Sequence, residues 1–588
     1  MAKLSFNALR VMEARYLRRD ARGRVVETPS EAFRRVAQAV AAAEAAWGGS
    51  VDFWSGEFFR MMEDLEFLPN SPTLMNAGTA FGQLSACFVL PVDDTMEGIF
   101  EAVKQMALVQ RTGGGTGFSF SRLRPKGSFI ASTGGEASGP VSFMKIFDAA
   151  TENIKQGGRR RGANMGILRV DHPDILEFVD AKRDGKSLQN FNISVGATDA
   201  FLKAARSGKR YDLLDPSTRK KAGSLKAAEV FRRIAEAAWA TGDPGLVFLD
   251  AINRGNPTPR LGAIEATNPC GEIPLLSYEA CNLGSINLSR MLRRKGRKTE
   301  LDWKKLGKTA RKGVRFLDDV VEANRYPFPE IDKMTRGNRK IGLGVMGFSE
   351  MLLLLGIPYD APEAARVGER IMRFLAGEAR EASRRLAKER GPYANWKGSV
   401  HERRRIRLRN AALTAIAPTG TISIIAGTTS GIEPLFALAY RRHALEGKIL
   451  LDANPIFLAH LKENGLHRKD ILKAVSEKGS LKGVPGIPEA TRRLFTTALE
   501  VSVDAHLAIQ AAFQKHVDNS VSKTINLPKE STPGDVARAY WAAWDLGLKG
   551  ITIYRYGSKP TQVLEVGTDE DPLQYEYSPK CDPTECRL

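Results

Sequence analysis

The stretch ATNPCGEIPLL, residues 266–276, and the closely following ACNLGSINL, residues 280–288, carry the strongest information in this chain. They contain Cys270 and Cys281, two of only five cysteines in 588 residues, and Cys270 is flanked by the amide Asn268 and the carboxylate Glu272. Small folds that depend on disulfides have a much higher cysteine density. The pattern therefore indicates radical and redox chemistry on cysteine rather than a disulfide scaffold.

The other three cysteines lie far from this stretch. Cys87 stands in the strand-like run LSACFVL, residues 84–90, where a single cysteine is by default a small buried hydrophobe. Cys581 and Cys586 lie within the last eight residues, and the sequence offers no second pair that would complete a zinc site with them. Since Cys270 and Cys281 also lack zinc-ligand spacing, we expect no metal site, and we interpret the C-terminal pair as a mobile dithiol.

The composition is that of a large water-soluble protein, with 43% hydrophobic and 26% charged residues. The longest apolar runs, such as residues 351–355, are far too short to span a membrane, and the N-terminus lacks the apolar segment of a secretory signal. Sparse cysteines fit a reducing compartment. The sequence thus predicts a cytoplasmic protein that is not associated with a membrane.

A formal net charge of +20 raises the question of nucleic-acid binding. The basic runs, such as RMLRRKGRK at 290–298 and RRRIRLR at 403–409, are scattered, and no RNA-recognition or helix-turn-helix signature surrounds them. We therefore expect small polyanionic ligands such as nucleotides, and no specific nucleic acid. Salt-dependent affinity for DNA would be the sign of the alternative.

Three regions can be distinguished along the chain. Residues 1–65 look mainly helical with one hairpin, and TPSE at 28–31 has the form of a capping box with proline at the first helical position. From 66 to 560, short apolar runs alternate with helical stretches, which predicts parallel strands in a large α/β domain. Residues 561–588 lose this periodicity and are predicted to form a flexible tail.

Two segments suggest nucleotide contacts. The glycine-rich GGGTG at 113–117 does not complete the dinucleotide-binding pattern, because Phe118 takes the place of the last glycine, but it could let backbone approach a ligand. In APTGTIS, residues 417–423, a strand-like run leads into a turn rich in small hydroxyl residues. If this turn opens a helix, its N–H groups form an anion site suited to phosphate; an ordinary helix cap is the equal alternative.

Taken together, these segments resemble the large catalytic subunit of ribonucleotide reductase. The 266–288 region is similar to the loop that carries the thiyl radical in that family, and LPNSPTLMNAG at 68–78, followed by Cys87, is similar to its substrate-side strand. The Gly113–Gly115 segment and the 418–423 turn follow in the family's order, so the likeness covers roughly residues 5–588. It implies a ten-stranded α/β barrel with a central finger loop, preceded by a small, mainly helical N-terminal region.

Within that family the chain resembles the class II enzymes, which use adenosylcobalamin. The segments QKHVDNSVSKTINLP at 514–528 and GITIYR at 550–555 are typical of them. Class I subunits, which receive a radical from a separate subunit, have two adjacent tyrosines near the second segment, whereas Arg555 here separates Tyr554 from Tyr556. The separated tyrosines argue against a class I large subunit, which is kept as the second hypothesis. DAHLAI at 504–509 lacks the final glycine of the motif with which other cobalamin enzymes replace the lower ligand.

The resemblance implies a role for every cysteine. Cys270 would carry the thiyl radical that abstracts the substrate 3′-hydrogen, with Glu272 as general base and Asn268 as its hydrogen-bonding partner. Cys87 and Cys281 would deliver two electrons and end as a disulfide, which requires Cα atoms within about 7 Å. The tail cysteines, Cys581 and Cys586, would reduce that disulfide and be recharged by a thioredoxin-like partner.

The same resemblance implies where nucleotides bind. The substrate, a ribonucleoside diphosphate, would contact Thr73, Ala86, Gly114, Asn268, Glu272, Thr419, Gly420, Thr421 and Ser423. Deoxynucleoside triphosphate or ATP effectors that select the substrate would contact Asp94, Arg124, Arg159, Arg160, Lys186 and Gln189, and the loop 186–192 would relay base identity to the substrate site. A homodimer is expected. A nucleotide-binding regulatory protein descended from the enzyme is a further alternative, against which the intact set of cysteines argues.

Overall fold

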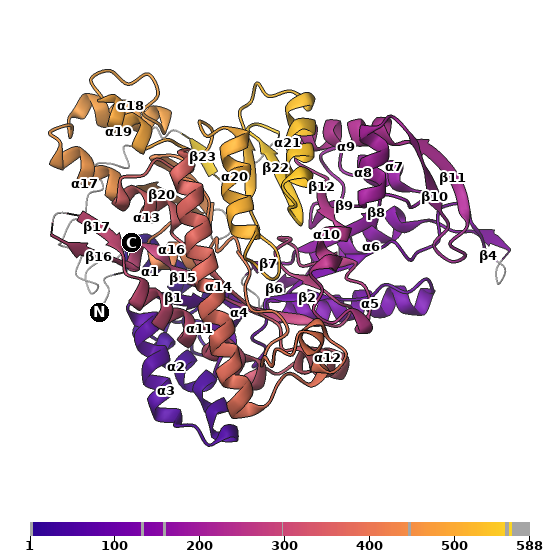
Figure 1. Ribbon diagram of the computed structural model, residues 1–588, viewed down its shortest axis with the longest axis horizontal. Coiled ribbons are helices and arrows are strands. Elements are labelled where there is room, and N and C mark those ends of the chain that lie inside the picture. Colours follow the sequence, from indigo (N-terminus) through magenta and orange to yellow (C-terminus); the bar gives the residue numbers. More distant parts are fainter. Residues whose placement is uncertain are drawn as a thin grey trace.

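The computed structural model describes residues 4–130, 134–156, 160–296, 298–444, 448–558 and 564–566. Its centre is a ten-stranded mixed sheet (Figure 1). The strands are β1 (Phe67–Pro69), β2 (Cys87–Val89), β3 (Gly115–Ser119), β8 (Asn164–Arg169), β9 (Phe191–Ala197), β12 (Gly245–Phe248), β15 (Ala280–Asn287), β18 (Ile341–Met346), β21 (Thr524–Leu527) and β22 (Gly550–Arg555).

The sheet closes into a barrel of two parallel halves. Strands β2, β3, β8, β9 and β12 are parallel neighbours, as are β15 with β18 and β21 with β22. The halves meet antiparallel at β2–β15 and at β12–β22, and the short strand β1 also pairs antiparallel with β15. Isolated parallel bridges, Leu343 to Thr414 and Ile416 to Val521, link β18 to the chain entering β21. The sequence predicted parallel pairing and a strand-like run leading into the turn of residues 417–423; the antiparallel seams were not foreseen, and Thr414 and Ile416 before that turn form bridges only.

Helices cover the outside of the barrel (Figure 1). Outside the N-terminal region, the longest are α5 (Met96–Arg111), α6 (Pro140–Glu152), α9 (Ala227–Thr241), α11 (Trp303–Ala323), α14 (Pro362–Arg390), α20 (Val503–Gln514) and α21 (Pro533–Asp545). Shorter ones are α4 (Ser71–Asn76), α7 (Ile175–Asp180), α8 (Asp199–Arg206), α10 (Leu249–Arg254), η2 (Pro259–Leu261), η3 (Leu288–Arg290), α12 (Pro329–Asn338), α13 (Phe348–Leu355), η4 (Ala394–Trp396), α15 (Val400–Arg403), α16 (Ile422–Ala426), α17 (Pro455–Glu463), α18 (Lys469–Lys478) and α19 (Glu489–Leu494). None of the helices in the described part of the chain is long and apolar enough to cross a membrane.

Small hairpins and a three-stranded sheet decorate the barrel. They are β4 (Phe129–Ile130) with β5 (Gly135–Glu136), β6 (Lys155–Gln156) with β7 (Arg160–Arg161), β10 (Arg210–Leu214) with β11 (Lys221–Lys226), β16 (Leu292–Lys295) with β17 (Lys298–Leu301), and β19 (Ala439–Ala444) between β20 (Lys448–Ala453) and β23 (Leu564–Val566).

The N-terminal region is helical, as its sequence predicted. It contains α1 (Phe6–Arg15), α2 (Pro29–Ala41), η1 (Ala42–Trp47) and α3 (Val51–Glu63), and an antiparallel bridge from Arg19 to Val25 closes the predicted hairpin. At the start of α2, Thr28 and Glu31 exchange hydrogen bonds as a capping box. These helices share one hydrophobic core with α11, α14 and β18, so they pack on one half of the barrel rather than forming a separate core.

A buried ion network also joins this region to the barrel. Arg390, fully buried at the end of α14, donates to Glu44 of η1 (2.6 Å) and to Asp318 (3.0 Å) and Asp319 (2.6 Å) of α11. Removing one partner of such a network leaves an uncompensated buried charge, which typically costs about 3–5 kcal/mol. The position of the N-terminal helices against the barrel is therefore specified by charge as well as by apolar packing.

A hairpin enters the barrel. Its strands β13 (Ala266–Thr267) and β14 (Pro274–Leu275) pair antiparallel and carry residues 268–273 at the tip. Ile273 and Leu275 pack with Met165 and other strand residues in a buried cluster. A Cβ on Gly117 of β3 would lie 1.8 Å from the carbonyl oxygen of Thr267, so only glycine there allows the hairpin to pass. This hairpin is the predicted finger loop.

Candidate active site

Cys87 and Cys281 face each other in the barrel wall. They are register partners across the antiparallel junction of β2 and β15. Residues directly opposite in such a pair have Cα atoms about 4.5–5.5 Å apart, inside the range that a disulfide spans. Both thiols are free and buried in this structure. The fold therefore brings the two cysteines, distant in sequence, within reach of each other.

The finger tip places Asn268 and Glu272 beside this pair. The Nδ2 group of Asn268 donates to the Glu272 carboxylate (2.9 Å) and to the sulfur of Cys87 (3.2 Å), and its Oδ1 accepts from the backbone N–H of Ile273 (3.0 Å). Because both ends of the amide are bonded, its orientation is fixed. Asn268 thus connects the carboxylate of the finger to a thiol of the barrel wall.

Burial dominates the electrostatics of the cluster. It raises the pKa of Glu272 to about 7, against the weaker opposing effect of the Asn268 hydrogen bond. It also raises the pKa of Cys87 well above its usual value, and the neighbouring Glu272 raises it further. Burial likewise raises the pKa of Cys281. At neutral pH both wall thiols are protonated, while Glu272 is poised to exchange a proton.

Cys270 differs from the other two cysteines because it is exposed, at the turn of the finger. Gly271 has φ of +79°, and its N–H bonds the Asn268 carbonyl (3.0 Å), which closes a tight turn behind the thiol. The cluster therefore combines one accessible thiol with two buried ones and a carboxylate.

Two supports of the finger were missed by sequence reasoning. Asn192 of β9 donates its side-chain N–H to the carbonyl of Pro269 (2.8 Å), and the backbone N–H of Ser520 donates to the carbonyl of Glu272 (2.8 Å). They hold the tip from two sides of the barrel. Since each is an ordinary polar group far from 268–272 in the chain, no local pattern could have identified it.

The register of Cys87 and Cys281 leads to a prediction. In a variant whose tail cysteines are both replaced by serine, diamide is expected to form one Cys87–Cys281 disulfide, which mass spectrometry of non-reduced peptides detects. Because the pKa of each thiol is raised, oxidation should accelerate as pH rises from 7 to 9. Cys281→Ser is the control that should abolish this crosslink. A dominant Cys87–Cys270 crosslink would contradict the pairing.

Three of the residues predicted to contact the substrate, Thr73, Ala86 and Gly114, have defined positions in the fold. Thr73, buried on α4, donates to the Leu84 carbonyl (2.9 Å), just before Ala86. The backbone of Ala86 bonds both neighbouring strands. Its N–H donates to the carbonyl of Cys281 (3.1 Å), and its carbonyl accepts from the N–H of Gly115 (2.8 Å). The glycine at 114 has a packing reason, because a Cβ there would lie 2.6 Å from both Phe88 and Val109.

The predicted phosphate turn does open a helix, the five-residue α16, with Thr421 at its N-cap position. Thr419 adopts φ of +51°, a strained conformation for a β-branched residue, and its hydroxyl accepts from the N–H of Gly431 (2.7 Å). Gly420 is exposed, and the Ser423 hydroxyl contacts that of Ser430 (3.1 Å). The turn is thus held in a defined shape that presents exposed backbone at Gly420.

Of the predicted effector residues, Asp94 and Arg124 come together. The guanidinium of Arg124 donates to the Asp94 carboxylate (2.7 Å), and its backbone N–H does so too (3.1 Å). In the loop that follows α7, the bonds of Lys186 and Gln189 stay within the loop, to Asp184 and Gly185. Arg160 begins β7. The remaining effector residue, Arg159, and the tail cysteines, Cys581 and Cys586, lie outside the described residues.

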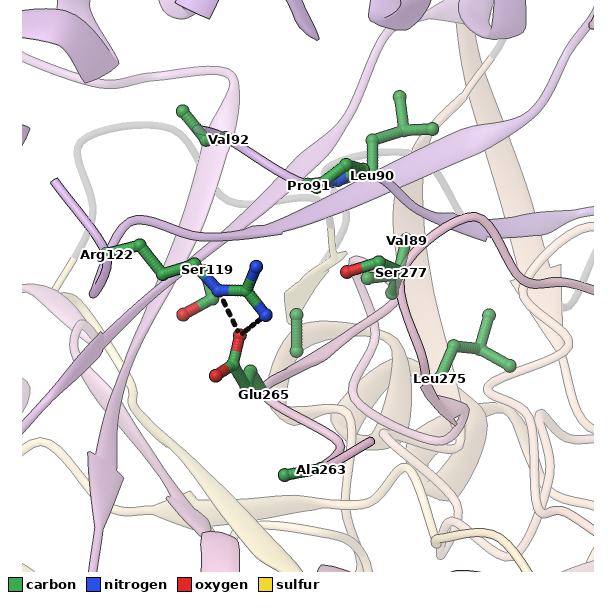
Figure 2. Close-up of a pocket in the computed structure, with 11 residues that line it drawn as sticks. Val89, Leu90, Pro91, Val92, Ser119, Arg122, Ala263, Glu265, Leu275 and Ser277 are labelled. Carbon is green, nitrogen blue, oxygen red and sulfur yellow. Dashed lines mark hydrogen bonds and ion pairs between the residues drawn. The ribbon is translucent and has the colours of Figure 1, made fainter. Parts of the chain in front are cut away.

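A small pocket lies between residues 89–92, with Arg122, and the base of the finger hairpin, where Glu265 and Leu275 line it (Figure 2). Arg122 reaches across it to Glu265, the residue before β13, at 2.9 Å. Its cavity volume of about 10 Å³ has room for about one water molecule. The pocket is too small for a nucleotide.

A closed barrel of two parallel halves, with a thiol on an internal finger opposite a thiol pair in the wall, defines the catalytic subunit of a ribonucleotide reductase. Two family models match: residues 2–82 fit the ribonucleotide reductase all-alpha domain, and residues 85–554 fit the ribonucleotide reductase barrel domain. The chain belongs to the ribonucleotide reductase family.

Individual relatives narrow this assignment. The chain is 52% identical to a vitamin B12-dependent ribonucleoside-diphosphate reductase of Mycobacterium tuberculosis, over 96% of this chain and 81% of that one. It is 48% identical to the protein of that name from Thermoplasma acidophilum, over 97% of this chain and 81% of that one. A solved structure, the class Id ribonucleotide reductase alpha subunit of Actinobacillus ureae, superposes with a TM-score of 0.76 at 25% identity and covers 94% of this chain and 97% of that one.

The relatives also decide between the two hypotheses for the radical source. Identity is 48–52% to three vitamin B12-dependent ribonucleoside-diphosphate reductases, against 29% to the ribonucleoside-diphosphate reductase large chain of Neurospora crassa. The class II assignment of the sequence is confirmed, and the class I alternative is not supported.

Proposed function

We propose that this chain is an adenosylcobalamin-dependent reductase that converts ribonucleoside diphosphates to 2′-deoxyribonucleoside diphosphates and so supplies DNA precursors. The observation that carries the proposal is the cluster of Cys87, Cys281, Cys270, Asn268 and Glu272, five groups that the fold gathers from two wall strands and the finger. The near 50% identity to B12-dependent reductases supports the same reaction.

The chemistry replaces a ribose 2′-hydroxyl by hydrogen and releases water, which takes two electrons. In the proposed roles, Cys270 as a thiyl abstracts the 3′-hydrogen and returns a hydrogen at the end of the cycle. Glu272 accepts the proton of the 3′-hydroxyl, for which a pKa of about 7 is suited. Cys87 and Cys281 each give up one hydrogen and join as a disulfide, which balances the two electrons.

The residues present fit the cofactor. A radical initiator must reach a thiol, and Cys270 is the exposed one of the three described cysteines. When bound, adenosylcobalamin supplies the initiating radical equivalent. His506 is buried and bonded to the carbonyl of Ala498 (3.1 Å), so it is not presented as a metal ligand.

The remaining parts of the proposal concern partners. Thr73, Ala86, Gly114 and the 419–423 turn would bind substrate, and Asp94 with Arg124 would mark the site of a deoxynucleotide or ATP effector. Cys581 and Cys586, on a tail from about residue 561, would reduce the Cys87–Cys281 disulfide and receive electrons from a thioredoxin-like protein. A homodimer is the proposed assembly.

Anaerobic assays of CDP and ADP reduction, with dithiothreitol as reductant and each of the four effector nucleotides, test the proposal. Turnover is expected only with adenosylcobalamin, and without a second protein. A folded chain that shows no turnover under any effector until a metal-containing partner is added would contradict the proposal and restore the class I hypothesis.

A further inference from the structure

Three of the segments proposed to surround the substrate carry no positive charge of their own. No lysine or arginine occurs in residues 66–78, in the finger region 263–288, or in the phosphate turn and its continuation, residues 417–431. A nucleoside diphosphate bears two to three negative charges, and oxygen anions of this kind are commonly bound through arginine. A cation that binds the phosphates must therefore come from outside these three segments.

The end of α1 brings an arginine to this place. Arg15, the last residue of α1, donates from Nη1 to the hydroxyl of Thr421 (3.1 Å), the N-cap residue of α16 in the phosphate turn. The side chains lie 406 positions apart in sequence, so the contact is made by the fold alone. Arg15 is only partly exposed. Its guanidinium is thus held at Thr421, the residue that follows the exposed Gly420.

Packing fixes α1 in this position. Val11 and Met12 of α1 lie in the same buried core as Ile422 and Ile425 of α16, so the two helices support each other. The next residue, Tyr16, is buried and its hydroxyl contacts that of Ser71 (2.8 Å), at the start of α4. The end of α1 therefore touches both the phosphate turn and the helix that carries Thr73.

From this geometry we propose that Arg15 is a substrate-binding residue, contributed by the N-terminal helical region, that recognises the phosphate groups of the ribonucleotide. The inference rests on the proposed function, because it takes 419–423 as the phosphate turn. A guanidinium presents five N–H donors in a fixed plane, so a bond to Thr421 positions the group for charge-assisted bonds to phosphate oxygens. The N-terminal region then completes the substrate site as well as packing on the barrel.

The test compares Arg15→Ala and Arg15→Lys with a matched control, Arg10→Ala. Arg10 is exposed on the same helix, with its guanidinium 4.7 Å from the centre of the Phe6 ring and no contact to the turn among those described. Two quantities are measured on the full chain. One is the Kd for labelled CDP by equilibrium dialysis, with saturating dATP to fill the proposed effector site; the other is KM and kcat with adenosylcobalamin and dithiothreitol.

Loss of a charge-assisted bond to phosphate should raise Kd and KM of Arg15→Ala by about tenfold or more, with kcat changed less than about threefold. Arg15→Lys should recover a large part of the affinity, since it restores the charge, and Arg10→Ala should behave as the unaltered chain. Cytidine, which lacks phosphates, should not discriminate between the variants when it competes with CDP.

A fall in kcat or thermal stability with unchanged Kd and KM would overturn the inference, because that is the signature of a structural role. So would an equal loss of affinity in Arg10→Ala. Failure of the proposed function is separate: a chain that reduces no nucleotide, but whose CDP affinity falls in Arg15→Ala, would still support Arg15 as a phosphate-binding residue.

Discussion

Replacing Cys270 by alanine or serine is expected to abolish CDP reduction, a loss of at least about 10⁴-fold, as for other residues that carry the chemistry itself. The proposed reaction needs a hydrogen atom to be taken from a thiol and later returned to it. Serine preserves the shape but not the chemistry, because an O–H bond is much stronger than an S–H bond. The buried thiols cannot substitute, since both lie in the wall strands rather than on the exposed finger turn.

The control for this prediction is the fold. Cys270 is exposed, so its replacement should change the free energy of unfolding by less than about 0.5 kcal/mol, and CDP should still bind in equilibrium dialysis. Turnover is followed as deoxycytidine diphosphate formed under anaerobic conditions. Residual turnover within tenfold of the unaltered chain would place the radical on another residue and refute the assignment.

Much of the fold followed from local patterns. The capping box at Thr28 and Glu31 and the strand containing Cys87 were predicted, because caps and short apolar runs act within a few residues. The antiparallel seams at β2–β15 and β12–β22 were not, since pairing between distant strands leaves no local signal. The barrel with its finger was expected from the family resemblance rather than from periodicity.

In the candidate site, too, the contacts between residues near in sequence could be predicted, and those between distant segments could not. Cys270, Asn268 and Glu272 share five positions of sequence, so their proximity was evident, whereas the pairing of Cys87 with Cys281 depended on the resemblance and is now given by the strand register. Neither the supports of the finger nor the reach of Arg15 to the phosphate turn could be predicted, since they join segments that only the closed barrel brings together.

Replacing Glu272 by glutamine is expected to lower kcat for CDP by about 10²–10⁴-fold, the usual contribution of a general base. Glutamine is nearly the same size and keeps a hydrogen-bonding group beside Asn268, but it cannot accept a proton. The carboxylate is the active form, so turnover of the unaltered chain should rise with pH through the Glu272 pKa of about 7 and then level off. The variant should lack this rise. The control is Glu265→Gln, at the base of the same hairpin, which should retain it.

The Asn268→Ala variant separates Glu272 from any other group that titrates near pH 7, because it should shift the pKa of Glu272 in a known direction. The hydrogen bond from Asn268 lowers the pKa of Glu272, against the larger effect of burial, so Asn268→Ala should move the rise in kcat to higher pH while reducing its height. Measuring kcat at saturating CDP, rather than at low concentration, excludes the ionisation of the substrate phosphate, which has a pKa near 6. If the midpoint stays in place in Asn268→Ala, or the rise persists in Glu272→Gln, then a different residue accepts the proton. If both variants behave as expected, the base is the carboxylate that Asn268 holds on the finger, next to the thiol of Cys87.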